Sequence, residues 1–81
     1  MKAVIHVMPK PDVLDPQGRA IARASAALGH AEVRDVRQGK VFLVELEASD
    51  PARARALVEE LCQKLLANPV IEDFSIERLE P

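Results

Sequence analysis

The 81-residue sequence contains no tryptophan and no tyrosine, and it has only two phenylalanines. Without clustered aromatic rings there is no surface on which the bases of a single-stranded nucleic acid could stack. The formal net charge of −2 gives no long-range attraction for nucleic acid or for anionic lipid. These absences argue against a nucleic-acid-binding protein and against a membrane-surface protein.

Cysteine is equally scarce. The single Cys62 cannot form an internal disulfide, which fits a reducing cytoplasm. Pro9 and Pro11 interrupt the apolar N-terminal run, so that it is too short for a signal-peptide core or a membrane span. We therefore expect a soluble, cytoplasmic protein that forms one domain over residues 1–81.

The sequence shows no recognisable cluster of catalytic or metal-binding residues. His6 and His30 are the only imidazoles, and neither has a Cys, Asp or Glu at a spacing typical of a metal site. Cys62 has no fixed cationic neighbour, so we expect a partly buried, inert thiol. No two carboxylates are spaced for acid–base work. We therefore predict no catalytic residue, no metal site and no cofactor bound by this chain.

Two Asp-Pro pairs, Asp15-Pro16 and Asp50-Pro51, each open an amphipathic segment. Asp can accept hydrogen bonds from the free N–H groups of a helix's first turn, and Pro fits the first helical position because no N–H is needed there. The pattern predicts one helix over residues 16–28, closed by Gly29, and another over 51–67. The second helix should bury a single stripe, made of Ala54, Leu57, Val58, Leu61 and Leu65.

Alternating and apolar runs predict four strands, over residues 2–8, 32–37, 40–47 and 71–79. Gln38-Gly39 would form the tight turn of a hairpin between the second and third strands. The order βαββαβ predicts an α+β, ferredoxin-like fold. Such a fold has a four-stranded antiparallel sheet in the order 4-1-3-2, with both helices on one face.

The third predicted strand is apolar on both sides, which leaves part of the open sheet face apolar. Val4, Val41 and Leu43 should lie together on that face, because the first and third strands are neighbours in this topology. A contiguous apolar patch of this kind is typical of an interface. We therefore predict self-association through these three residues, as a homodimer or a homotetramer.

Three blocks of sequence stand out in addition, over residues 13–18 (VLDPQG), 36–40 (VRQGK) and 66–72 (LANPVIE). In order, spacing and coverage of the chain they resemble the PurS family, the small subunits of phosphoribosylformylglycinamidine (FGAM) synthase. The resemblance implies a non-catalytic subunit of a glutamine- and ATP-dependent C–N ligase of purine biosynthesis. Its partners would be a large synthetase subunit and a glutaminase subunit, which use ATP, Mg²⁺ and glutamine. Its role would be assembly of the complex and transfer of ammonia within it.

Most residues of these blocks have an evident role in the predicted fold, but Gln17, Arg37 and Lys40 do not. We predict that these three contact partner subunits, although the basic residues could instead form a solvated surface. Gly18 lies inside the first turn of a helix, where Ala would favour the helix by up to about 1 kcal/mol. Either another backbone approaches closely there, or the glycine is simply tolerated.

Two other functions stay open on the sequence. Related βαββαβ domains serve as stand-alone regulatory modules that bind a small molecule, for which Gly29 and the loop after the first strand are available. A self-sufficient enzyme of the muconolactone isomerase type would need a positioned acid–base group, and His6 is the sole candidate.

Overall fold

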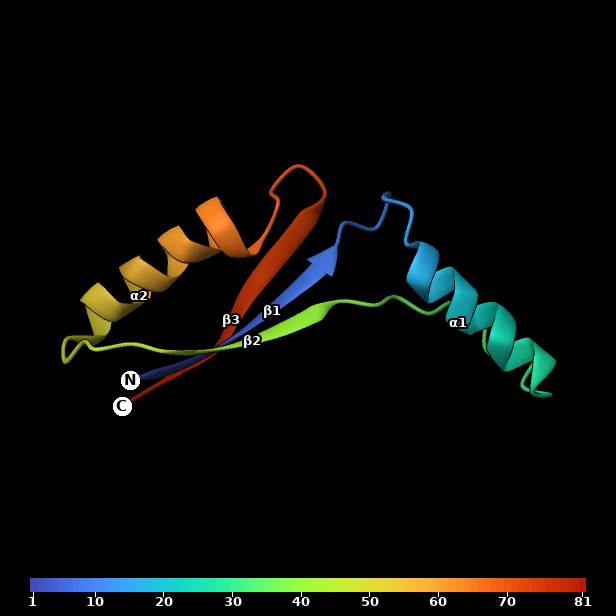
Figure 1. Ribbon diagram of the computed structural model, residues 1–81, viewed down its shortest axis with the longest axis horizontal. Helices are drawn as coiled ribbons and strands as arrows, with labels where there is room; N and C mark the ends of the chain where they lie inside the picture. The colour runs from blue at the N-terminus through green and yellow to red at the C-terminus, as the bar shows by residue number, and fades with distance from the viewer.

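The computed structural model describes residues 1–81, and its three strands form one antiparallel sheet in the order β2-β1-β3 (Figure 1). Two α-helices accompany the sheet, and the second one continues into a π-helical turn, η1. Both chain termini lie at the same end of the sheet (Figure 1). The elements, in chain order, are β1 (Lys2–Pro9), α1 (Pro16–Ala27), β2 (Lys40–Glu45), α2 (Pro51–Leu61), η1 (Cys62–Leu66) and β3 (Glu72–Glu80).

Both helices begin as the Asp-Pro pairs predict. The Asp15 carboxylate accepts a hydrogen bond of 3.1 Å from the backbone N–H of Gly18, and the Asp50 carboxylate accepts one of 3.1 Å from the N–H of Ala52. Gly29 follows the end of α1 with a φ of 98°, a left-handed conformation that favours glycine. The sequence signals for helix starts and stops are therefore confirmed.

The hydrophobic core lies between the sheet and α2. The central strand β1 buries Ala3, Ile5 and Val7 on one face, and α2 with η1 packs Val58 and Cys62 against them. Cys62 is fully buried, whereas the sequence predicts a partly buried thiol. Only 8 of the 81 residues are buried, so the chain by itself encloses a small core.

The predicted stripe of the second helix is correct in part. Ala54 and Val58 are buried, but Leu57 and Leu65 are 39% and 75% exposed. The buried line runs instead through positions 54, 58 and 62, one helical turn apart. The π-helical turn η1 also changes the phase of the last residues, which moves Leu65 away from the sheet.

The second of the four predicted strands, over residues 32–37, is not formed. Residues 32–37 belong to no strand, and residues 33–39 lead from the far end of α1 back to β2 (Figure 1). The predicted hairpin turn at Gln38-Gly39 is also wrong, because Gly39 does not have a positive φ. Its lack of a side chain serves another purpose: an added Cβ would collide with the backbone oxygen of Val7 and the side chain of Met8 in β1.

The placement of α1 differs from the prediction as well. Only α2 covers the sheet, whereas α1 projects away from it (Figure 1). The molecule measures 50 × 25 × 14 Å, and its radius of gyration is 16.1 Å. A compact chain of this length would have a radius of gyration of about 12 Å. We call residues 10–39, which contain α1, the arm; its helix has no sheet to pack against within its own chain.

Candidate partner interface

The three blocks that carry the family resemblance meet at the end of the sheet where the arm leaves it. The Asp15 carboxylate accepts a 2.7 Å hydrogen bond from the backbone N–H of Gln38, which joins the first block to the second. The Lys40 ammonium lies 3.4 Å from the Glu72 carboxylate, which joins the second block to the third. Glu72 also accepts a 2.8 Å hydrogen bond from the N–H of Asn68. Segments far apart in the sequence thus form one connected polar cluster.

Arg37 has a structural role that the sequence does not reveal. Its guanidinium donates hydrogen bonds to three successive backbone carbonyls, those of Pro9 (3.1 Å), Lys10 (2.7 Å) and Pro11 (3.2 Å). Lys40 likewise has a partner within the chain, in Glu72. Gln17 lies exposed in the first turn of α1. Of the three residues predicted to contact partner subunits, Gln17 therefore still lacks a role in the fold.

The glycine at position 18 is required by a close backbone approach and is not simply tolerated. An added Cβ there would collide with the carbonyl oxygen of Val36, on the segment that returns from the arm. The first turn of α1 therefore lies directly against this segment, and the glycine permits a close backbone approach. A side chain at this position would push the two segments apart.

The two carboxylates of the cluster are held in their charged form. Hydrogen bonds from the N–H groups of Gln38 and Gly18 lower the pKa of Asp15 below its usual value of 3.8, and Arg37 acts in the same direction. The N–H of Asn68 and the Lys40 ammonium lower the pKa of Glu72 below 4.5. Both groups thus carry a negative charge at neutral pH, where they bind N–H donors best.

The predicted apolar patch exists on the sheet face opposite α2. In the register between β1 and β2, Val4 lies opposite Leu43, and His6 lies opposite Val41. Val41 is 60% exposed and Leu43 is 78% exposed, while Val4 is half-buried between the strands. The three residues therefore share one open face, which we call the outer sheet patch.

A second apolar surface escapes the sequence analysis. In α1, Ile21 is 44% exposed and Leu28, just beyond its end, is 77% exposed. Their helical spacing predicts a buried face, and nothing in the sequence distinguishes burial within the chain from burial against another molecule. Leu57 and Leu65 line an apolar slot on the flank of α2 and are uncovered for the same reason.

The remaining titratable groups form no comparable cluster. His6 lies 3.5 Å from Glu77 on the outer face of the sheet, and burial raises the pKa of the Cys62 thiol. No three side chains of His, Cys, Asp or Glu come together as metal ligands. Neither helix is long and apolar enough to cross a bilayer.

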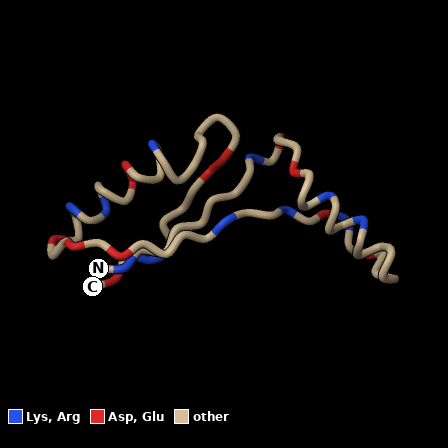
Figure 2. The backbone as a smooth tube through the Cα atoms, viewed as in Figure 1, with Lys and Arg blue, Asp and Glu red and all other residues tan.

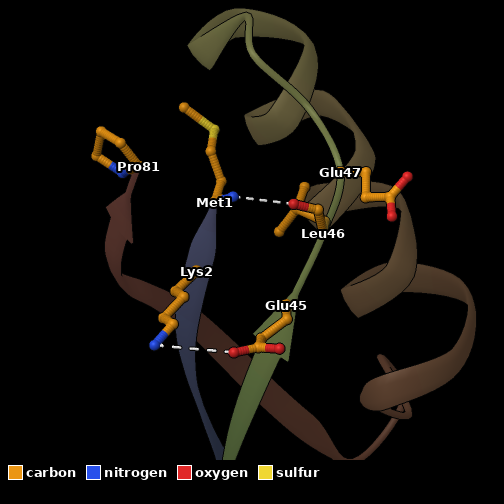
Figure 3. Close-up of a pocket in the computed structure, with 6 residues that line it drawn as sticks. All are labelled: Met1, Lys2, Glu45, Leu46, Glu47 and Pro81. Carbon is orange, nitrogen blue, oxygen red and sulfur yellow. Dashed lines mark hydrogen bonds and ion pairs between the residues drawn. The ribbon is translucent and has the colours of Figure 1, made fainter.

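An open hollow of about 420 Å³ lies beside the chain termini (Figure 3). The Met1 ammonium donates a 2.9 Å hydrogen bond to the Leu46 carbonyl there, and Lys2 pairs with Glu45 at 3.8 Å. These contacts continue the pairing between β1 and the segment after β2. The hollow is at the opposite end of the sheet from the polar cluster.

Comparison with known proteins places this arrangement in a family. The family model for PurS, described as phosphoribosylformylglycinamidine (FGAM) synthase, matches residues 2–80. The chain belongs to the PurS family. The PurS subunit of FGAM synthase from Mycobacterium leprae is 48% identical over 77 residues, which cover 95% of this chain and 94% of that protein. As a PurS chain, the protein is a subunit of FGAM synthase, a ligase of purine biosynthesis.

Solved PurS structures have the same architecture. A crystal structure of Bacillus subtilis PurS is 46% identical and superposes with a TM-score of 0.86, covering 98% of both chains. A chain in the PurLQS structure from Thermotoga maritima is 33% identical and gives a TM-score of 0.85, covering 96% of this chain and 95% of that one. Because these superpositions include nearly every residue, the arm of this chain has a counterpart in both of these PurS chains.

Proposed function

We propose that this chain is the assembly subunit that brings the synthetase and glutaminase subunits of FGAM synthase together. The name of the Thermotoga maritima PurLQS structure, which holds a similar PurS chain with PurL and PurQ, supports this proposal. The observation that carries it is the arm, an amphipathic helix with no sheet of its own to cover. Catalysis belongs to the partner subunits, which use ATP, Mg²⁺ and glutamine in the cytoplasm, and this chain binds none of them.

The first partner of the arm is a second copy of the chain. The flank of α2 exposes Leu57 and Leu65, and the half-buried Phe42 and Val44 lie on the same sheet face as α2. An apolar helix laid beside α2 would cover these side chains, and its natural source is α1 of another copy. Two chains that exchange arms would each gain the second helix that the ferredoxin-like pattern calls for.

Charge supports the same pairing. The arm carries five Lys and Arg residues against four Asp and Glu, whereas the rest of the chain carries six against nine (Figure 2). A slightly basic arm would therefore approach an acidic body. The outer sheet patch, with Val4, Val41 and Leu43, lies on the opposite face and is free to join two such pairs.

Assembly matters chemically because ammonia has to travel from the glutaminase to the synthetase. Free ammonia becomes mostly protonated at neutral pH, and the ammonium ion has no lone pair with which to attack an activated carbon. A subunit that holds the two active sites in one closed complex keeps ammonia unprotonated until it reacts. This role requires no catalytic side chain in the small subunit.

Reconstitution tests the proposal. Purified synthetase and glutaminase are mixed with and without this chain, and glutamine-dependent FGAM formation is measured. We expect activity only when the chain is present, whereas ammonium chloride should support the synthetase in its absence. Glutamine-dependent activity that does not respond to the chain would reject the proposal.

A further inference from the structure

We propose that Asp15 and Arg37 form a brace that fixes the direction in which the arm leaves the sheet. The arm joins the sheet only through residues 9–15, which lead out, and residues 36–39, which lead back. We call these two segments the neck. The functional consequence of the brace rests on the assembly role proposed above, but its effect on arm direction does not.

Arg37 lies on the returning segment and binds the outgoing one. The guanidinium contacts the carbonyls of Pro9, Lys10 and Pro11, at distances of 2.7 to 3.2 Å. Pro9 is the last residue of β1, and Lys10 and Pro11 lie beyond it; the Lys10 carbonyl also accepts a 3.0 Å hydrogen bond from the N–H of Val13. A planar guanidinium can donate several hydrogen bonds in fixed directions, which a lysine ammonium cannot reproduce at three carbonyls. Arg37 therefore sets the course of the outgoing segment.

Asp15 makes the opposite connection, from the outgoing segment to the returning one. Its Oδ1 atom accepts from the N–H of Gly18 and caps α1, while its Oδ2 atom accepts from the N–H of Gln38 at 2.7 Å. Asp50 opens α2 with the same Asp-Pro sequence, but it accepts only from the N–H of Ala52, within its own helix. The second bond of Asp15 is thus additional to helix capping.

The close contact at Gly18 completes the brace. The first turn of α1 lies directly on the backbone at Val36, one residue before Arg37. The outgoing chain, including the first turn of α1, is consequently joined to the returning segment at three places: by Arg37, by Asp15 and at the Gly18 backbone. Two chain segments that are joined by hydrogen bonds in this way resist bending better than two independent loops.

The length of the arm makes this stiffness matter. At 1.5 Å per residue, the 12-residue helix α1 extends about 18 Å from the neck. A change of about 20° at the neck would move its far end by about 6 Å, which is more than one helical turn. Such an error would place Leu28 out of register with any surface it is meant to cover. A fixed neck therefore presents the arm in one orientation before a partner binds.

Two substitutions separate the brace from general stability. Asp15→Asn keeps a good helix cap through its amide oxygen, but its NH2 group replaces the oxygen that faces Gln38 and cannot accept from that N–H. Arg37→Lys keeps the charge and loses the planar set of donors. The matched controls are Asp50→Asn, at the cap that lacks the second bond, and Arg34→Lys, at an exposed position three residues before Arg37.

The direct measurement is the distance from arm to body. Spin labels are attached at Ala26→Cys in α1 and Gln63→Cys in η1, in a Cys62→Ala background, and the labelled chain is diluted into excess unlabelled chain. We expect one narrow distance distribution in the labelled chain without further substitution and in the two control variants. Asp15→Asn and Arg37→Lys should widen it at least twofold, while hydrogen exchange of the β1 amides stays unchanged. The proposal would be overturned if the distribution of the brace variants stayed narrow. It would also be overturned if the β1 amides lost protection when the distribution widened.

Reconstituted FGAM formation then shows what the brace is for. The two brace variants should require about tenfold more chain to reach half of the maximal rate and should reach the same maximum at saturation. If the unsubstituted chain fails to support activity while the brace variants still widen the distance distribution, the assembly role is wrong and the brace stands. If the chain supports activity and the distribution does not change, the brace is wrong and the assembly role stands.

Discussion

The Lys40 ammonium and the Glu72 carboxylate lie 3.4 Å apart at the neck end of the sheet, although β1 separates their two strands. Lys40 is the first residue of β2 and Glu72 is the first residue of β3. The pair therefore links both edge strands across the last residues of the central one. Since Glu72 also accepts from the N–H of Asn68, it connects the loop after η1 to the start of the last strand.

This arrangement predicts a loss of stability for Glu72→Gln. The amide would lose the attraction of Lys40 and weaken the bond from Asn68, which we expect to lower the free energy of unfolding by about 1 kcal/mol at pH 7. Urea unfolding monitored by circular dichroism measures this change. Glu47→Gln, at an exposed carboxylate after β2, is the matched control and should change stability very little.

The contribution of Glu72 should depend on pH in a definite direction. Because its pKa in the folded protein lies below the usual 4.5, the folded state holds its proton less tightly than the unfolded chain does. The stabilisation is therefore fully present above pH 4.5 or so and is lost as the pH falls through the lowered folded value. Unfolding curves of the wild type and Glu72→Gln should converge on acidification. A gap that stays constant down to pH 3 or so would contradict this account.

Val58 and Leu65 should respond differently to truncation. Val58→Ala removes two methyl groups from a fully buried site and should cost about 1–3 kcal/mol of folding stability. Leu65→Ala removes more atoms from a site that is 75% exposed, so at low protein concentration its effect should remain below about 0.5 kcal/mol. Urea titrations at two protein concentrations measure both. At high protein concentration Leu65→Ala should cost more stability than Val58→Ala, because a second copy of the chain would then cover the flank of α2.

A charge in the outer sheet patch should weaken self-association. Leu43→Glu places a carboxylate at a side chain that is 78% exposed, so the monomer should fold normally while any contact through this face loses its apolar surface. Sedimentation equilibrium should show at least a tenfold rise in the dissociation constant. Ser49→Glu adds the same charge to an exposed position between β2 and α2, outside the patch, and serves as control. Equal association by Leu43→Glu and the wild type would exclude the patch as an interface.

The Cys62 thiol should report global unfolding. It is fully buried, and burial together with the nearby Glu59 carboxylate raises its pKa, so that little reactive thiolate exists at neutral pH. We expect a disulfide reagent to modify it only at the rate at which the core opens, with fast modification in denaturant. Rapid modification in native buffer, under conditions where circular dichroism shows full structure, would contradict the position of η1 against the sheet.

Local chemistry allowed much of the fold to be predicted from the sequence. Asp15 and Asp50 mark the two helix starts and Gly29 marks a helix end, because capping and a positive φ depend on a few adjacent residues. The alternation in residues 2–8 likewise gives β1 and its buried face. The apolar patch of Val4, Val41 and Leu43 also follows, because the pairing of the first and third predicted strands is observed.

What the sequence could not provide is the number of strands and the place of α1. Residues 32–37 have the composition of a strand, yet a strand forms only where a neighbour offers free backbone groups, and here the returning segment lies against α1. The structural role of Arg37 was hidden for a related reason, since its three carbonyl partners come from a segment more than twenty residues earlier.

The sequence by itself determined the helices, the three strands that pair and the membership of the PurS family, because each depends on short patterns of residues. Only the tertiary structure decided that α1 stands away from the sheet. An amphipathic helix records in its sequence that one face must be covered, and it does not record by which molecule. That choice depends on the neck, where Asp15 and Arg37 bring together backbone segments that are distant along the chain.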